Sequence, residues 1–593
     1  MKIGGFRPPP CGEGHVAFTT MADPAMDAPT QAIPVPRPSE QEDASIPDTL
    51  GTSHRSSLSG FFVGSFLGPQ RSPRALAEDE TQPMLTPDPH APFAPPHDPR
   101  IPIAPAPTSM GNASGYGTMR PPAAAAMPAP GEAPTAHQEI RDELWVLTRY
   151  TIPIWATHVL ELSLSMVSVF SLGHLGTVEL AAASLAGMTA NVTGFSVISG
   201  LICALDTLLP AAYTRQPQMM GLWTQRVGVV VALTLPWIIL LWLNAERGLL
   251  LLHQEPEIAH KARQFLSVLA IGLPGHAMFE LCRRFLQAQG LMHAPTVVLL
   301  IVSPLNAFAN YILVWGPPSV RFGFLGAPLA SAISMWLMAI LCFLQCVVAS
   351  NHTWGGWSRK AFDWAGLRVC LSLGLAGLLS LATEWWAWEI VGLVTAALGT
   401  TALASQSVLL ITSSVTYQLP YGAAVAASVR VGNMLGAGKL QGAHLASRAS
   451  LLLSFVIGLF NSSLVYVARH KWGYLFSSDP VVVQLVATVL PILALFQCAD
   501  CVCGIAAGIL RGCGRQSLSA GINLTAYYVV GIPMSLFLAF GPPHMGLAGL
   551  WWGLTFALIY GAALALWCVQ RTDWQAVMRK MHHNMGFSEA DDV

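Results

Sequence analysis

The stretch GLAGLWWGLTFALIYGAALALWCV at residues 546–569 runs for 24 residues without a charged side chain. An α-helix rises about 1.5 Å per residue, so this stretch is long enough to cross the roughly 30 Å of hydrocarbon in a bilayer. It therefore predicts a membrane-spanning helix.

Eleven further predominantly apolar stretches precede it, some with one or more charged residues, which gives twelve predicted spans. Short loops rich in glycine and proline separate several of them, as at residues 315–323 and 540–546. The sequence therefore predicts an all-α integral membrane protein that crosses the membrane many times. The spans are expected near residues 148–172, 180–210, 224–243, 262–285, 294–315, 325–350, 366–396, 402–430, 443–467, 481–509, 516–541 and 546–569.

The composition excludes several other classes of protein. Of the 593 residues, 53% are hydrophobic and 11% are charged, whereas a soluble domain carries about 25% charged residues. A net charge of -1 gives no general attraction to a phosphate backbone, so no nucleic-acid partner is expected. The chain contains no sequence motif for zinc, haem or a phosphate-binding loop. We expect no enzymatic activity, no cofactor and no metal.

The N-terminal segment 1–140 differs from the rest of the chain. It holds 26 of the 43 prolines and shows no apolar period, so residues 1–140 are predicted to be a disordered cytoplasmic tail. An N-terminal bundle is predicted at 141–350, a C-terminal bundle at 351–575 and a cytoplasmic C-terminal tail at 576–593. The segment ETQPML at 80–85 resembles an acidic dileucine sorting signal, which favours a vacuolar membrane, with the plasma membrane as the alternative.

Basic residues predict the orientation, because Lys and Arg in short loops stay in the cytosol. With both termini cytoplasmic, seventeen basic residues fall in inner segments and six in outer loops. Arg283, Arg284 and Arg511 are counted among the inner ones. This excess predicts an even number of spans with both ends in the cytosol.

The second half of the chain repeats the first. GTVELAAAS at 176–184 matches GTTALASQS at 399–407, an offset of 223 in the numbering, and a second match after spans four and ten has an offset of 224. Repeats separated by an even number of crossings keep the same orientation. The sequence therefore predicts two parallel-repeat bundles of six helices each.

Acidic side chains in or beside the spans are candidates for function. A carboxylate at the bilayer centre costs about 2.5 to 3.5 kcal/mol unless it faces a wet cavity. No basic residue is expected deep enough to neutralise these carboxylates, so they should bind cations or carry protons. The candidates are Glu161, Asp206, Glu280, Glu384, Glu389 and Asp500.

Three motifs resemble one family. EWWAWE at 384–389, PYGAAVAASVRVGNMLGAG at 420–438 and GILRGCGRQ at 508–516 are similar to the eukaryotic branch of the multidrug and toxic compound extrusion (MATE) family. The proline-rich tail is similar to those of fungal members, and the resemblance covers about residues 145–580. It implies two six-helix bundles that form a V-shaped cleft, and an organic substrate that leaves the cytosol as protons enter.

The resemblance implies that Glu384 and Asp500 bind the cation and couple transport, with Glu389 as a third carboxylate. Glu384 and Glu389 are five residues apart, so they lie about 140° apart around a helix. Both cannot point straight at one cavity unless the helix distorts, and Glu389 can instead be a buried hydrogen-bond anchor. Because 161 plus 223 is 384, Glu161 is predicted to be a second titratable site, with a carboxylate near a helix end as the alternative.

Further residues are predicted to line the cavity or to gate it. Aromatic rings bind flat cations by cation–π contact, although packing and interfacial belts explain such rings equally well. Asp206 and Arg430 occupy nearly equivalent inner ends and are predicted to pair as a cytoplasmic gate, with helix capping as the alternative. The predicted cavity residues are Trp385, Trp388, Tyr417, Gln406 and Asn191.

These observations predict a proton-coupled antiporter that exports xenobiotics or organic, cationic small molecules by alternating access. Its expected partners are the substrate, protons and the lipid bilayer, and a monomer is expected. A sodium-coupled exporter and a vacuolar metabolite transporter are alternatives. A lipid-linked sugar flippase would need basic residues in the cleft to bind phosphate, and none is expected there.

Overall fold

The computed structural model describes residues 136–349 and 352–586. Within these ranges the chain forms helices and turns, and no strand. Nearly all of the tail predicted at 1–140, including the segment at 80–85, lies outside the described residues. The first described helix, α1, begins at Ala136.

The first half of the chain forms ten α-helices and two short helices of other types. The π-helix η1 lies inside the second predicted span, and the 3-10 helix η2 precedes α10. The bounds are α1 Ala136–Gly173, α2 Thr177–Ala190, η1 Asn191–Phe195, α3 Ser196–Ile202, α4 Leu205–Arg215, α5 Met219–Leu243, α6 Ala245–Leu251, α7 Pro256–Leu269, α8 Leu273–Ala288, α9 His293–Trp315, η2 Gly323–Leu325 and α10 Gly326–Ala349.

The second half contains the longest uninterrupted helices after α1. A second π-helix, η5, lies between α15 and α16. The bounds are η3 Arg359–Phe362, α11 Trp364–Ala396, α12 Thr400–Gly436, α13 Leu440–Trp472, η4 Gly473–Leu475, α14 Pro480–Gly512, α15 Gln516–Leu524, η5 Thr525–Gly531, α16 Ile532–Phe540, α17 Gly546–Gln570 and α18 Trp574–Met585.

All twelve predicted spans coincide with helices. Among the described residues, ten helical segments are long and apolar enough to cross a membrane, and the pair α7–α8, bent by 52°, provides an eleventh. The remaining span, predicted at 402–430, is the 37-residue helix α12. Its polar side chains Ser405, Gln406 and Thr412 are buried against other helices, which explains how a less apolar helix fits among the spans. The predicted all-α membrane fold is confirmed.

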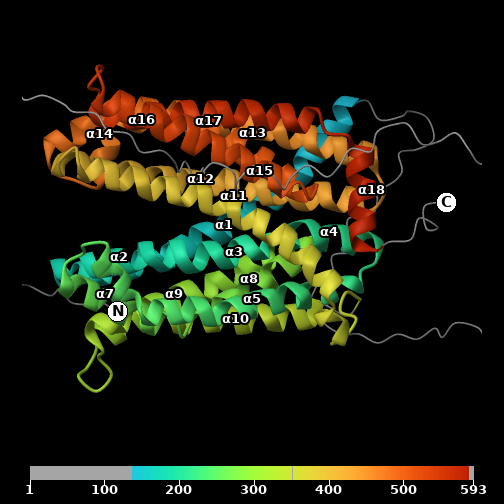
Figure 1. Ribbon diagram of the computed structural model, residues 1–593, viewed down its shortest axis with the longest axis horizontal. Coiled ribbons are helices and arrows are strands. Elements are labelled where there is room, and N and C mark those ends of the chain that lie inside the picture. The colour runs from blue at the N-terminus through green and yellow to red at the C-terminus, as the bar shows by residue number, and fades with distance from the viewer. Residues whose placement is uncertain (1–135, 350–351, 587–593) are drawn as a thin grey trace, which may run out of the picture. The chain divides into compact units, whose positions relative to one another are not determined.

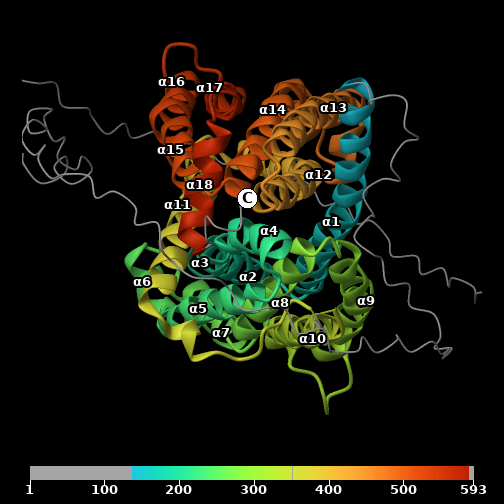
Figure 2. The ribbon, with the colours of Figure 1, turned by 90° about the vertical axis from the view of Figure 1, so that its right-hand side faces the viewer.

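The first helix of each half begins beside the other half. Figures 1 and 2 show α1 (blue) starting next to α13 and ending among the N-terminal helices, while α11 (yellow) starts beside the N-terminal helices and ends among the C-terminal ones. Accordingly α1 packs on α12 and α13 as well as on α9, and α11 packs on α3 and α5 as well as on α15. The two bundles are therefore joined by a pair of crossed helices.

The bend between α7 and α8 positions the charged face of α8. A Cβ atom added to Gly272 would lie 2.7 Å from the Cα atom of Ala332, so the chain approaches α10 too closely there for a larger residue. Leu273 and a proline then begin α8, as is common in the first turn of a helix. The polar side chains of α8 follow at three- and four-residue spacing and share one face.

The two bundles meet closely around α4. The Thr207 hydroxyl donates to the carbonyl oxygen of Arg511 at 2.5 Å, and the Gln516 amide donates to the carbonyl oxygen of Cys203 at 2.8 Å. A Cβ atom added to Gly377 would lie 2.7 Å from the carbonyl oxygen of Gly200, so α11 and α3 touch backbone to backbone. These contacts close the space between the bundles at one end.

Helix α18 begins at the end of the predicted C-terminal bundle, and most of it lies in the segment 576–593 predicted as the C-terminal tail. In Figures 1 and 2 it runs across the ends of the other helices, next to α4. The Asp573 carboxylate accepts hydrogen bonds from the backbone N–H groups of Gln575 and Ala576 and so caps its start. His582 contacts both bundles, since one ring nitrogen lies 3.3 Å from Arg215 Nη1 and the other 3.2 Å from the carbonyl oxygen of Leu435.

Candidate functional site: a cavity between the bundles

A cavity of about 950 Å³ lies between the two bundles. Its walls come from α1, α2 and α8 on one side and from α11, α12 and α14 on the other. This volume is in the range of pockets that hold drug-sized ligands. The cavity is therefore large enough for an organic small molecule.

The wall from the C-terminal bundle carries three carboxylates. Glu384 and Glu389 of α11 and Asp500 of α14 all line the cavity. The cavity is wide enough to reach both glutamates, although they lie about 140° apart around α11. In the described part of the chain, none of these three side chains has a hydrogen bond or an ion pair. This wall therefore presents three carboxyl groups without a hydrogen-bond or ion-pair partner among the described residues, with the Arg511 guanidinium of α14 elsewhere in the same wall.

The wall from the N-terminal bundle carries carboxylates that are already paired. Arg283 Nη1 lies 2.9 Å from Glu161 Oε2, and Arg283 Nη2 lies 2.5 Å from Glu280 Oε1. Arg284 also contacts Glu280, and its Nε atom lies 3.1 Å from Asp206 Oδ1. Each carboxylate thus has a guanidinium partner, so this chain of ion pairs carries little net charge.

Two histidines complete this wall. His158 Nδ1 lies 3.3 Å from Glu161 Oε2, and the His276 ring packs edge-on against Phe195 with 4.8 Å between the ring centroids. His276 is 9% exposed, and its Nε2 atom has no hydrogen-bond partner among the described residues. An imidazole nitrogen buried without a partner costs about 1 to 3 kcal/mol, so His276 holds an unused polar group beside the cavity.

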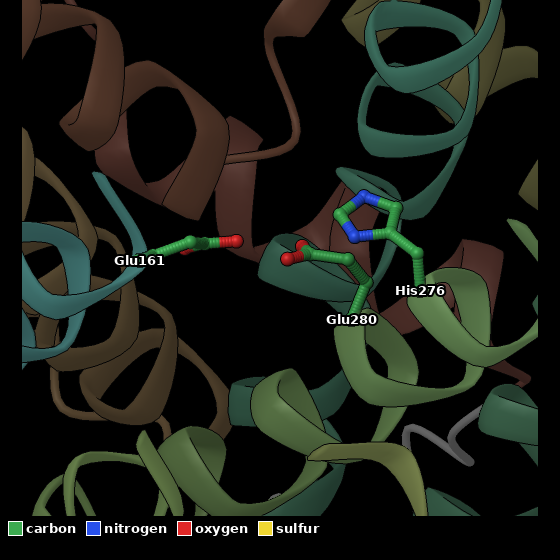
Figure 3. Close-up of side chains that lie close together, drawn as sticks. All are labelled: Glu161, His276 and Glu280. Carbon is green, nitrogen blue, oxygen red and sulfur yellow. The ribbon is translucent and has the colours of Figure 1, made fainter. Parts of the chain in front are cut away.

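Figure 3 shows Glu161 of α1 and the pair His276 and Glu280 of α8 extending toward one another. Their candidate ligand atoms lie within 4.8 Å of one another, a spacing compatible with a metal ion. Arg283 and Arg284, however, already occupy the carboxylate oxygens that a cation would need. The charges around this cluster therefore disfavour a divalent cation.

The expectation that no basic residue lies in the core is wrong. Arg283 and Arg284 are 5% and 7% exposed within α8, and Arg283 and Arg511 line the cavity. Arg283 and Arg284 lie at the end of the fourth predicted span, 262–285, and Arg511 lies just after the tenth, 481–509, so all three are counted as inner residues. The argument against a flippase that relied on a cleft without basic residues therefore fails, although these guanidinium groups lie within reach of carboxylates.

The predicted pair of Asp206 and Arg430 does not form. Asp206 contacts Arg284 and lies 3.9 Å from Arg511 Nε, whereas Arg430 binds Glu143 with distances of 2.5 and 2.8 Å. Each charge has a nearer partner, and Glu143 falls in α1 before the first predicted span. Asp206 nevertheless links the bundles, because Arg284 belongs to the N-terminal bundle and Arg511 to the C-terminal one.

All five residues predicted from the sequence as cavity residues lie in the wall of the cavity. Trp385, which also lines it, is followed by Trp386, which does not line it and is 46% exposed. Trp388 packs on Trp551 and Phe496, with ring centroids 5.8 and 5.7 Å apart. The five are Trp385, Trp388, Tyr417, Gln406 and Asn191.

The arginine pairs had a signal in the sequence. Arg283 and Arg284 follow Glu280 by three and four residues, the spacing at which side chains meet on one helix face. The same spacing places His276 four residues before Glu280. The partners from other helices, Glu161 and Asp206, are separated by 122 and 78 residues from their arginines, and no local pattern indicates them.

Comparison with known proteins agrees with the duplicated architecture. The MatE family model matches the chain twice, at residues 153–312 and 377–537. The starts of the two matches differ by 224 and their ends by 225 in the numbering, close to the offsets of 223 and 224 in the sequence repeat. The family model therefore matches each of the two predicted bundles once.

Similar proteins include transporters of fungi and animals. An uncharacterized transporter of Schizosaccharomyces pombe is 40% identical, with 76% of this chain and 82% of that protein covered. Multidrug and toxin extrusion protein 1 of Homo sapiens is 34% identical, with 75% of this chain and 78% of that protein covered.

A solved structure shows the same fold. The eukaryotic MATE transporter AtDTX14 superposes with a TM-score of 0.71 at 30% identity, covering 75% of this chain and 100% of that one. The duplicated match, the helical architecture and these relatives lead to one conclusion: the chain belongs to the MatE family of multidrug and toxin extrusion transporters.

Proposed function

We propose that this transporter is a proton-coupled antiporter that exports organic cations by alternating access. The observation that supports it is the contrast between the two cavity walls. Glu384 and Asp500 face the cavity without a partner among the described residues, whereas Glu161 and Glu280 are paired with arginines. Unpaired carboxylates in a low-dielectric cavity attract either a proton or an organic cation.

Competition between protons and the cationic substrate for these carboxylates would exchange one for the other across the membrane. When Glu384 and Asp500 bind protons, their attraction for a cationic substrate is lost and the substrate leaves. When the protons leave on the other side, the negative charge returns and a new substrate binds. Trp385 and Tyr417 stand in the same wall and would hold a flat cation by its face.

The contacts around α4 provide one of the two closures that alternating access needs. With both termini in the cytosol, as the basic residues predict, this closed end faces the cytosol. Opening it requires separation of Thr207 from Arg511 and of Gln516 from Cys203. Proton binding at Glu384 and Asp500 would bias the equilibrium between the two states. A vacuolar or a plasma membrane would each supply the necessary proton gradient.

The test is uptake of a fluorescent organic cation into proteoliposomes under an imposed proton gradient. Wild type is expected to accumulate the dye, and Glu384→Gln and Asp500→Asn are each expected to lose gradient-driven uptake. Glu246→Gln is the matched control, because Glu246 pairs with Arg263 on α7 and does not line the cavity.

Two outcomes would contradict the proposal. Unchanged uptake in both carboxylate variants would place coupling elsewhere in the cavity. Uptake that follows an imposed sodium gradient, and not a proton gradient, would replace the proposed coupling ion.

A further inference from the structure

A second pocket, of about 310 Å³, lies beside the closure around α4. Thr207 and Leu208 of α4 form one side, Leu373 of α11 forms another, and the turn at residues 513–515 forms a third. Helix α18 and its N-cap Asp573 line it with a stripe of residues at 573, 576, 577, 580, 581, 584 and 585. The pocket is separate from the central cavity, since the two share no lining residue.

The pocket combines a cationic rim with an apolar floor. Arg515, Arg571 and Lys580 bring three positive charges to its lining, and Asp573 brings one negative charge. The Asp573 carboxylate already accepts two backbone N–H groups as the cap of α18. The floor consists of aliphatic and thioether side chains, namely Leu208, Leu373, Val577, Met581 and Met585.

Two of the three cationic side chains make no polar contact with the described residues. In the part of the chain that the structure describes, the side chains of Arg571 and Lys580 have neither a hydrogen bond nor an ion pair, and both are exposed. Arg515 donates one hydrogen bond, to the Thr572 hydroxyl at 2.9 Å. A guanidinium group has five N–H donors, so Arg515 keeps most of its binding capacity.

We propose that this pocket binds the phosphate group of an anionic membrane phospholipid. Arg571, Lys580 and Arg515 would hold the phosphate by charge-assisted hydrogen bonds. Leu208, Leu373 and the apolar stripe of α18 would contact the glycerol backbone and the first part of an acyl chain. Basic pockets between membrane helices are known places for such headgroups.

Position and chemistry favour a lipid over free phosphate. Arg571 directly follows Gln570, the last residue of the membrane-spanning helix α17, so the rim lies at the membrane boundary. A free phosphate would leave the apolar floor uncovered, whereas a phospholipid fills both parts of the pocket. The tendency of Lys and Arg to stay on the cytosolic side explains why this side of the protein carries many positive charges. It does not explain why three of them line the same pocket.

A lipid in this pocket would hold the two bundles together. The pocket lies against Thr207 of the N-terminal bundle and Cys513, Gly514 and Arg515 of the C-terminal bundle. Thr207 also donates across the closure to Arg511. A bound phospholipid therefore stabilises the state in which this end is closed, and a cycle of opening would have to release or shift it.

The experiment measures binding to the purified full-length protein in a neutral detergent. The probes are dioctanoyl phosphatidic acid, dioctanoyl phosphatidylcholine and glycerol 3-phosphate, and the readout is the ligand-dependent rise in apparent melting temperature. Phosphatidic acid is expected to bind saturably, phosphatidylcholine much more weakly, and glycerol 3-phosphate at least tenfold more weakly than phosphatidic acid. The double variant Arg571→Gln with Lys580→Gln is expected to weaken phosphatidic acid binding at least tenfold.

Arg579→Gln is the matched control, because Arg579 neighbours Lys580 on α18, is exposed and does not line the pocket. It is expected to leave phosphatidic acid binding within twofold of wild type. Equal weakening by the control would show general surface attraction and overturn the proposal. Equal binding of glycerol 3-phosphate would indicate a free-phosphate site, and binding of none of the probes would also refute the lipid site. None of these outcomes depends on whether Glu384 and Asp500 couple transport to protons, so the lipid site and the proposed function are tested separately.

Discussion

Asp206 of α4 and Arg511 of α14 face each other across the two bundles, with 3.9 Å between Oδ2 and Nε. The other oxygen of Asp206 accepts a hydrogen bond from Arg284, so one carboxylate contacts a guanidinium group from each bundle. Beside it, Thr207 donates to the carbonyl oxygen of Arg511. The closure therefore contains one carboxylate between two guanidinium groups, of which Arg284 is buried and Arg511 is partly buried.

Asp206→Asn is expected to lower the stability of the transporter. It leaves Arg284 and Arg511 without their shared counter-charge, and removal of one member of a buried ion pair typically costs about 3 kcal/mol. The apparent melting temperature in detergent is expected to fall by several degrees. Glu257→Gln is the control, because Glu257 is 62% exposed in its pair with Lys261 and should contribute about 0.5 kcal/mol or less. Equal melting temperatures for the two variants would contradict the assigned role.

Glu161→Gln and Glu384→Gln are expected to have opposite effects on stability and on coupling. Glu161→Gln removes one of the two carboxylates that hold Arg283 and should cost about 2 kcal/mol. Glu384→Gln breaks no ion pair and should leave the melting temperature nearly unchanged while gradient-driven uptake is lost. Melting curves and dye uptake on the same preparations check both. A Glu161→Gln protein with full stability and no uptake would instead support Glu161 as a second titratable site.

Binding of an organic cation is expected to weaken as the pH falls. If each bound cation displaces one proton from Glu384 or Asp500, the apparent Kd rises about tenfold per pH unit once these carboxylates are protonated. Equilibrium binding of the fluorescent cation at a series of pH values measures this slope. The slope is expected to flatten in the double variant Glu384→Gln with Asp500→Asn. A slope that is the same in the double variant would assign the displaced proton to another group.

Trp385→Ala is expected to weaken binding of a flat aromatic cation by a factor of about 2 to 30, which corresponds to about 0.5 to 2 kcal/mol of cation–π attraction. Trp386→Ala is the matched control, because Trp386 is the next residue on α11, is 46% exposed and does not line the cavity. Competition binding with an aromatic cation and a neutral aromatic compound of similar size separates attraction of the ring for the positive charge from contact with the ring alone. An equal loss of binding for the charged and the neutral compound in Trp385→Ala would contradict a cation–π contact at this ring.

The sequence predicted the fold well because the strongest signals were local. Apolar runs longer than a bilayer is thick predicted all twelve spans, and the repeat at an offset of 223 predicted the two bundles. The break between α7 and α8 was not predicted, since Gly272 is required by contact with Ala332, a residue 60 positions away. Long-range packing of this kind leaves no local pattern.

The charged residues were harder to place. A hydropathy window averages over the length of a whole span, so it does not show whether a basic residue near a span end faces the cytosol or the cavity, and both Arg283 and Arg511 line the cavity. Symmetry placed Asp206 opposite Arg430, but Arg430 pairs with Glu143, which lies before the first predicted span. Charge pairing depends on distances between helices, and neither hydropathy nor repeat offsets supply these.

The crossed start of α1 has a consequence for how the protein is made. The first turns of α1 pack on α12 and α13, which follow it by more than two hundred residues. During synthesis this part of α1 remains in the membrane without its packing contacts to α12 and α13 until the second bundle has been inserted. The N-terminal bundle therefore completes its packing only after the C-terminal bundle exists, so a chain that ends after α10 would leave its leading helix exposed to lipid and to quality-control proteases.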